Sequence, residues 1–180
     1  SSSPKLLTKV NRTLYFTRTG NTKGTELWKS NGTSASTLSV KDIRAGSEGS
    51  QIENLIDVNG ALFFTANDGI HGDELWKSDG TFTGTGLVKD LNPGSAGSNN
   101  TGGHGVPMHA FTNINGLLYF VASKGRDYFI YRSDGTDTGT KIIEPAVGVG
   151  INPPHPAFTY RNGKVYFFNM TEADGQYFLW

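Results

Sequence analysis

An eight-residue phrase recurs along this chain, and its spacing constrains the fold more than any other feature of the sequence. ELWKSNGT covers residues 26–33, ELWKSDGT covers 74–81 and FIYRSDGT covers 129–136. The aromatic residue of the phrase falls at Trp28, Trp76, Tyr131 and Trp180, in steps of 48, 55 and 49 residues. Regular recurrence at this period indicates structural repeats, with an insertion of about eight residues between residues 90 and 114.

The second unit predicts four short strands joined by tight turns. The expected strands cover residues 55–58, 61–66, 74–78 and 85–91. Asn59-Gly60 and Asp79-Gly80 between them are tight-turn dipeptides, because both members tolerate positive φ. Apolar residues show no helical spacing, and glycine at 24 of 180 residues together with 12% aromatics favours an all-β chain of short strands.

Four antiparallel strands in a repeat of 40 to 50 residues are typical of a β-propeller blade. A single sheet leaves a face uncovered until a neighbour stacks on it. We therefore expect Leu and Trp of ELWKS to point to opposite faces, both sandwiched, with Trp28, Trp76, Tyr131 and Trp180 in the core between blades. The predicted units cover about residues 5–54, 55–110, 111–157 and 158–180, the last incomplete.

The chain thus predicts one partial or small propeller of nearly four blades. We expect a part of a longer repeat protein whose further blades continue the stack. Closure by self-association and a compact four-bladed monomer are the alternatives, because an open stack exposes a strand edge and an apolar face.

The repeat resembles the bacterial ELWxxDGT (hyalin-like) repeat, whose pattern is VNGxLYFxAxDGxxGxELWxSDGTxxGTxLVKDIxPGSxGS. The second unit reads VNGALFFTANDGIHGDELWKSDGTFTGTGLVKDLNPGSAGS. The resemblance extends from about Lys5 to Trp180 and implies a propeller in a secreted or cell-surface protein, without an established activity. Phe129 and Phe178 replace the glutamate in the third and fourth units, so we do not expect that glutamate to be a catalytic group.

Two stretches are candidate ligand sites. The insertion at residues 92–109 is unique to one unit, and loops on rigid scaffolds often carry function, so Asn99, Asn100, His104 and His109 are the candidate ligand-binding residues. A tolerated surface insertion is the alternative. Another possible site, for calcium, combines Asn67, Asp68, Asp73 and Glu74. Turn formation explains the same residues without a metal, and we expect no cofactor.

Composition and motifs argue against several other classes of function. Lys+Arg and Asp+Glu are 16 each, which argues against a nucleic-acid partner. No apolar run is long enough for a membrane span, there is no cysteine, and neither Gly-x-Ser-x-Gly nor HExxH occurs. Asn-x-Ser/Thr sequons begin at Asn11, Asn31, Asn99 and Asn169.

We accordingly predict a non-catalytic scaffold for adhesion, matrix or protein contact, which binds a protein or glycan at the cell surface. A carbohydrate-binding propeller with stacking tryptophans is one alternative. The accessory propeller of an extracellular polysaccharide-acting enzyme is the other.

Overall fold

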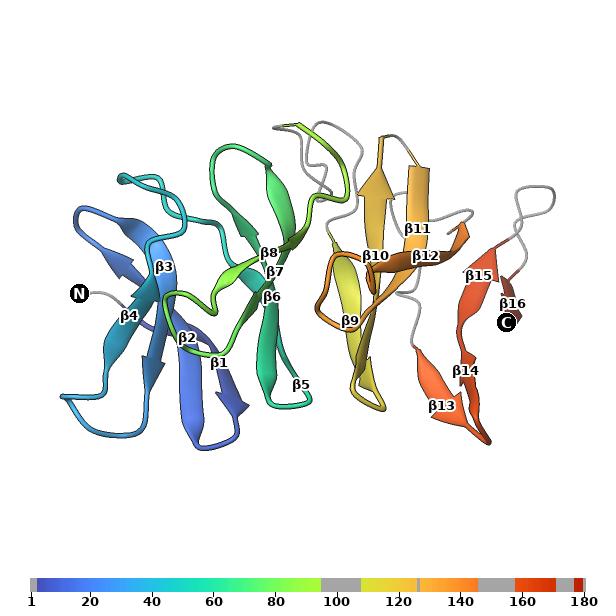
Figure 1. The fold of residues 1–180 in the computed structure, drawn as a ribbon, viewed down its shortest axis with the longest axis horizontal. Helices are drawn as coiled ribbons and strands as arrows, with labels where there is room; N and C mark the ends of the chain where they lie inside the picture. The colour runs from blue at the N-terminus through green and yellow to red at the C-terminus, as the bar shows by residue number, and fades with distance from the viewer. Residues whose placement is uncertain (1–2, 95–107, 126, 146–157, 171–176, 180) are drawn as a thin grey trace.

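The chain is an all-β protein in which short sheets follow one another along the molecule (Figure 1). A computed structural model describes residues 3–94, 108–125, 127–145, 158–170 and 177–179. The three four-stranded sheets lie side by side in chain order, and the two ends of the chain lie at opposite ends of the row (Figure 1).

Each of these sheets is an antiparallel meander in which consecutive strands pair. The first contains β1 (Lys5–Val10), β2 (Thr13–Gly20), β3 (Gly24–Ser30) and β4 (Leu38–Lys41). The second contains β5 (Glu53–Val58), β6 (Ala61–Asn67), β7 (Asp73–Ser78) and β8 (Gly86–Lys89). The third contains β9 (His109–Ile114), β10 (Leu117–Lys124), β11 (Asp127–Ser133) and β12 (Lys141–Pro145).

Two smaller sheets complete the described part of the chain. The strands β13 (Thr159–Arg161) and β14 (Lys164–Tyr166) form one pair, and β15 (Phe168–Met170) and β16 (Tyr177–Leu179) form the other. The stacked meanders give a β-propeller-like arrangement, as the repeat predicted. Among the described strands, none pairs the first sheet with the last.

Asn-Gly dipeptides form two-residue turns between the first and second strands of the second and third sheets. Asn59 and Gly60 have φ angles of 54° and 82°, and Asn115 and Gly116 have 53° and 79°. Positive φ at both central residues matches the twist of the flanking strands, so these turns set the register of the hairpins. In the second unit β5 begins two residues and β7 one residue before the expected strand, β6 ends one residue later, and β8 is shorter at both ends.

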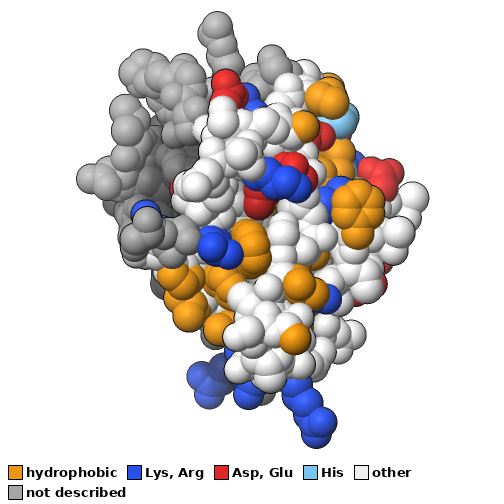
Figure 2. All heavy atoms as spheres, turned by 90° about the vertical axis from the view of Figure 1, so that its left-hand side faces the viewer, with side chains coloured by type: hydrophobic (Ala, Val, Ile, Leu, Met, Phe, Trp, Pro, Cys, Tyr) orange, Lys and Arg blue, Asp and Glu red, His pale blue; other side chains and the backbone are white. Residues whose placement is uncertain are grey.

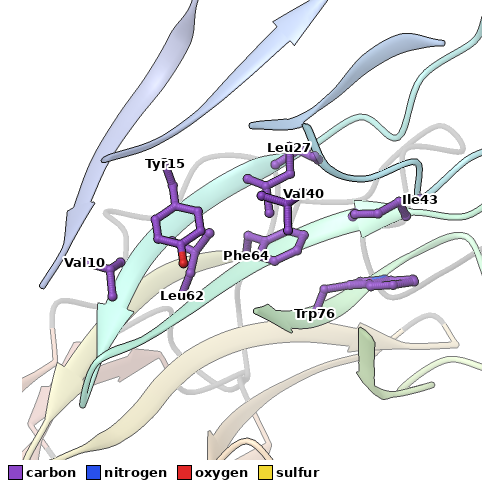
Figure 3. Close-up of a cluster of buried hydrophobic side chains, with 10 residues drawn as sticks. Val10, Tyr15, Leu27, Val40, Ile43, Leu62, Phe64 and Trp76 are labelled. Carbon is purple, nitrogen blue, oxygen red and sulfur yellow. The ribbon is translucent and has the colours of Figure 1, made fainter. Parts of the chain in front are cut away.

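The core consists of clusters between neighbouring sheets. Figure 3 shows the first interface, where side chains of the first sheet face Leu62, Phe64 and Trp76 of the second. The first sheet supplies Val10, Tyr15, Leu27 and Val40, and the linker after it supplies Ile43.

The next two interfaces repeat this arrangement. Leu75 of the second sheet packs with Phe120 and Tyr131 of the third, and Ile130 of the third packs with Phe158 and Phe167. The leucine position of the phrase therefore faces the following sheet, while the aromatic position faces the preceding one. Alternation along a strand produces this split.

The first strands of successive sheets lie next to each other, since β1 contacts β5 and β5 contacts β9. Each carries a bulge with a residue at positive φ: Leu6 at 54°, Asn54 at 57° and Ala110 at 60°. Leucine and alanine seldom adopt this conformation. The bulge is thus a feature of the repeat, imposed by the sheet rather than by the local residue type.

Candidate functional site

The repeated glutamate ties each sheet to the linker that follows it. The carboxylate of Glu26 accepts hydrogen bonds from the Ile43 amide (3.0 Å) and the Ser50 hydroxyl (2.8 Å). Glu74 accepts from the amides of Leu91 (3.0 Å) and Asn92 (3.2 Å). The residues are 2% and 0% exposed, so both carboxylates are buried.

The environment of Glu26 fits this structural role. Burial raises the pKa of Glu26, and the hydrogen bonds from Ile43 and Ser50 act in the opposite direction. A raised carboxyl pKa also occurs in catalytic acids. In this chain the buried carboxylate accepts hydrogen bonds from the linker, which gives it a structural role. The third sheet has Phe129 in place of the glutamate.

The Asp-Gly-Thr segment is a closed hydrogen-bonded turn. Asp79 Oδ1 accepts from the amide and the hydroxyl of Thr81, both at 2.7 Å. The third sheet repeats both bonds between Thr136 and Asp134, at 2.8 and 2.7 Å. The threonine hydrogen bonds lower the pKa of both aspartates. Turn stability explains the aspartates of the phrase without a ligand.

Lysines of one sheet bond to this turn in the next sheet, an arrangement we call the lysine lock. Lys29 donates to the carbonyl of Gly80 (2.7 Å), and Lys77 donates to the carbonyl of Gly135 (2.5 Å). A second lysine follows the same rule, because Lys41 donates to the Thr85 carbonyl at 2.7 Å. The lysine of ELWKS is therefore an inter-sheet contact.

The turn glycines are required by the same interface. Gly80 and Gly135 have φ angles of 88° and 85°, where a side chain is strained. A Cβ on Gly80 would meet the Tyr15 hydroxyl, and one on Gly135 would lie 2.8 Å from Cζ of Phe63. In each case an aromatic ring of the preceding sheet occupies the space.

The Gly-Ser linker also joins neighbouring sheets. The Ser50 amide donates to the Thr25 carbonyl (3.0 Å), and the Ser50 carbonyl accepts from the Asn67 amide (2.8 Å). Gly49 approaches the backbone of Gly24 so closely that neither position has room for a Cβ. This part of the linker is a structural bridge between the first two sheets.

The four calcium candidates have different surroundings. Asp68 accepts from the amides of Ile70 (2.8 Å) and His71 (2.9 Å) and contacts His71 Nδ1 at 2.7 Å. Burial would raise the pKa of Asp68, but the hydrogen bonds from His71 and Ile70 lower it overall.

Each of the other three candidates is placed by the second sheet or its loop. Asn67 Oδ1 accepts from the Gly69 amide at 2.8 Å, Glu74 bonds to the linker, and Asp73 is buried beside it on β7. Across the described residues, no three His, Asp or Glu side chains come together as a metal site would require.

The insertion lies only partly within the described residues. Asn99, Asn100 and His104 lie outside the described residues. His109 belongs to β9, where it lies opposite Val121 and is 8% exposed. Its place in a strand rather than a loop differs from the sequence expectation, because the pairing of β9 with β10 extends to this residue.

The repeated aromatics divide into two groups. Trp76 and Tyr131 are 6% and 3% exposed and lie between sheets, and burial raises the pKa of Tyr131 to about 12. Trp28 is half-buried on the outer face of the first sheet, with the Arg18 guanidinium 4.5 Å from its ring centroid. Trp180 lies outside the described residues.

Sequence reasoning missed two hollows. One, of about 400 Å³, is lined by Trp28, Arg18, Ser39 and Glu26 among others. The other, of about 800 Å³, lies along the first strands and is lined by residues including Lys5, Gln51, Glu53 and Asn54. The sequence signal for the first hollow was Arg18, which stands where the second and third units have alanine.

No protein-family model matches the chain, and no curated protein matches it. Two solved structures are similar to it in fold. One is an alpha-L-arabinofuranosidase from Clostridium thermocellum, with 11% identity, a TM-score of 0.37, and coverage of 95% of this chain and 82% of that chain. The other is a mutant of puromycin hydrolase complexed with PGG, with 14% identity, a TM-score of 0.37, and coverage of 93% and 33%.

The chain therefore spans about a third of the hydrolase's length. With both TM-scores below 0.5, these similarities carry no argument about activity. The geometry itself defines the class, a β-propeller-like all-β repeat protein. Within the described residues no helix is long and apolar enough to cross a membrane.

Proposed function

We propose that this chain is a non-catalytic interaction module, a rigid scaffold that contacts proteins or glycans at the cell surface or outside the cell. The observation that carries the proposal is the use made of the repeated polar residues. Glu26 and Glu74 bond to linkers, Asp79 closes a turn, and Lys29 and Lys77 cross to the next sheet. The conspicuous acids and bases of the repeat thus have structural partners.

A scaffold of this kind presents its loops and edges to a partner. The hydrogen bonds and apolar clusters between sheets hold the loops in fixed positions, which lowers the entropy lost on binding. The extracellular setting comes from the resemblance of the repeat, and it is part of the proposal. So is membership of the ELWxxDGT repeat family.

Burial weakens the carbohydrate-binding alternative. Trp76 and Tyr131 are enclosed between sheets and offer no open ring to a sugar. Trp28 is the repeated aromatic with partial exposure in the described part of the chain. A multivalent lectin built on the repeated aromatic would need the same exposure in several sheets.

The test combines binding and turnover on one set of ligands. The immobilised full chain is exposed to a panel of extracellular polysaccharides and matrix proteins, and the same polysaccharides are assayed for cleavage. We expect saturable binding without cleavage. Cleavage that a single acid substitution abolishes would overturn the non-catalytic reading, and glycan binding lost in Trp28→Ala alone would favour the lectin alternative.

A further inference from the structure

The first sheet carries an unfilled copy of the contact that joins the other sheets. Gly32 occupies the position of Gly80 and Gly135, with φ at 99°. In those two sheets a ring from the preceding sheet, Tyr15 or Phe63, lies against the glycine. A Cβ on Gly32 would meet no atom within 4 Å, and the glycine is exposed. We call the space beside Gly32 the socket.

The rest of the outer face of the first sheet also matches an inter-sheet face. Leu7 is 62% exposed, whereas Leu55, at the same position in the second sheet, packs against the core. Trp28 is half-buried, while its counterpart Trp76 is 6% exposed. Figure 2 views this end of the molecule and shows hydrophobic side chains between charged ones.

The hollow beside Trp28 has a counterpart that is filled. At the first interface Ile43 lies close to Trp76, and Val40 close to Phe64 (Figure 3). The corresponding region next to Trp28 is an open volume of about 400 Å³. The first sheet thus offers the same kind of receiving face as the second sheet, without its occupant.

The other end of the molecule offers a side chain that fits the socket. Tyr166, on β14, stands at the sequence position of Tyr15 and Phe63 in the fourth unit. Its neighbours Val165 and Phe167 pack against the third sheet. Alternation along a strand therefore directs Tyr166 away from the third sheet, as Tyr15 and Phe63 are directed toward the sheet that follows them.

We propose that the outer face of the first sheet binds the C-terminal end of a second copy of this chain, with Tyr166 of that copy in the socket at Gly32. The association is head to tail, so each copy uses two different surfaces. It continues the inter-sheet stacking of the monomer across two molecules. The inference is independent of the proposed function, because it concerns a self-contact and not a surface ligand.

The first sheet also differs from the later ones in a way that the contact must accommodate. Arg18 replaces Ala66 and Ser39 replaces Leu87 on the receiving face. These changes make the face more polar and keep Trp28 partly covered in the free chain. A more polar face gives a contact that is reversible and depends on concentration.

The first experiment measures the molar mass of the full chain by light scattering across a range of concentrations. The monomer mass is 19.4 kDa, and we expect the mass to rise to multiples of it. Leu7→Glu should weaken the association by about tenfold or more, since it places a charge in the contact. Ile70→Glu is the matched control, because Ile70 is 70% exposed on a loop of the second sheet; it should leave the association unchanged.

A second variant places a side chain in the socket. Asparagine tolerates positive φ better than other side chains, so Gly32→Asn should lower the melting temperature less than Gly32→Val does, and both variants should reduce the association. A chain that stays monomeric at all concentrations would overturn the proposal, and so would equal effects of Leu7→Glu and Ile70→Glu.

A mixing experiment tests the head-to-tail geometry. Leu7→Glu blocks the receiving face, and Tyr166→Asp blocks the inserting end. Each variant alone should be monomeric, and the mixture should form a heterodimer through the one intact pair of surfaces. Circular dichroism melting confirms that both variants are folded. If the variants are folded and do not form the heterodimer, the head-to-tail arrangement is wrong. This is also the result expected if the association joined two identical faces.

Discussion

At the scale of single residues, buried polar groups with definite partners distinguish this chain from a generic stack of sheets. A carboxylate at 0% exposure is costly to bury unless hydrogen bonds satisfy it. Glu74 meets this condition with two linker amides. The repeated glutamate therefore specifies where the linker leaves the first and the second sheet.

Replacing Glu74 tests this role directly. Glu74→Ala leaves the amides of Leu91 and Asn92 without their acceptor, and we expect the free energy of unfolding to fall by about 2–3 kcal/mol. Glu74→Gln keeps one acceptor oxygen and should cost less. Urea denaturation measures both, with the exposed Glu53→Ala as control. Equal stability of Glu74→Ala and the control would refute the assignment.

The pH dependence of stability contains two opposite contributions. Asp79 and Asp134 have pKa values lowered from 3.8 by threonine hydrogen bonds, so the folded state binds their protons less tightly than the unfolded state. Their contribution to the free energy of unfolding is fully present above pH 3.8, and it is lost as the pH falls through the lowered pKa of the folded state. Burial raises the pKa of Glu26 above 4.5, so the protonated side chain stabilises the folded state at low pH. This contribution is lost as the pH rises from 4.5 through the raised pKa of the folded state.

The double variant Asp79→Asn/Asp134→Asn should therefore lose less stability on acidification than the parent chain. Melting temperatures between neutral pH and about pH 2 give the two slopes. The variant Glu26→Gln should shift the profile in the other direction, with a larger relative loss in acid. Parallel profiles for all three chains would show that these carboxyls do not control acid stability.

At the scale of elements, local signals were easier to find in the sequence than contacts between sheets. The strand bounds follow from alternation and from dipeptides such as Asn59-Gly60, which act within a few residues. The lysine lock joins Lys29 to Gly80 and Lys77 to Gly135, residues 51 and 58 positions apart. A sequence pattern shows that these residues recur but not that they bond to each other.

The candidate site shows the same limit. Trp28 and Trp76 sit in identical ELWKS segments, yet one is half-buried and the other is 6% exposed. The difference arises from the neighbouring sheet, because the first sheet covers Trp76 and no sheet of the described residues covers the outer side of Trp28. Burial of a repeated residue depends on its position in the stack, which local sequence does not encode.

The lysine lock predicts a position-dependent effect of one substitution. Lys77→Met removes the hydrogen bond to the Gly135 carbonyl and should lower the free energy of unfolding by about 1–2 kcal/mol. Arg132 holds the same position in the third sheet and is exposed, so Arg132→Met is the matched control with an expected change below about 0.5 kcal/mol. Chemical denaturation distinguishes the two, and equal losses would contradict the lock.

At the scale of the whole molecule, each sheet is stabilised by contacts with its nearest neighbours. Each apolar cluster joins only two successive sheets. In such stacks the stability of a unit depends on its own strands and on its interfaces. Among the described residues, the second and third sheets have an apolar cluster on each face, whereas the first sheet has one on a single face.

Amide hydrogen exchange should follow this order. We expect the slowest exchange in β6 and β10, which are central strands of sheets with two interfaces. We expect the fastest exchange in β13 and β14, which form a sheet of two strands. Mass spectrometry of peptides from each sheet measures the gradient. Uniform protection along the chain would show one cooperative unit in place of neighbour-to-neighbour stabilisation.

The direction of the lysine lock bears on how chains of this kind change length in evolution. In the second sheet one segment of the repeat, residues 74–81, contains both Lys77, which donates to the third sheet, and Gly80, which accepts from the first. Duplication or loss of one whole repeat consequently preserves complementary surfaces on both sides of the junction. The length of such an array can change by entire repeats without compensating substitutions, whereas a gain or loss of half a repeat separates donor from acceptor.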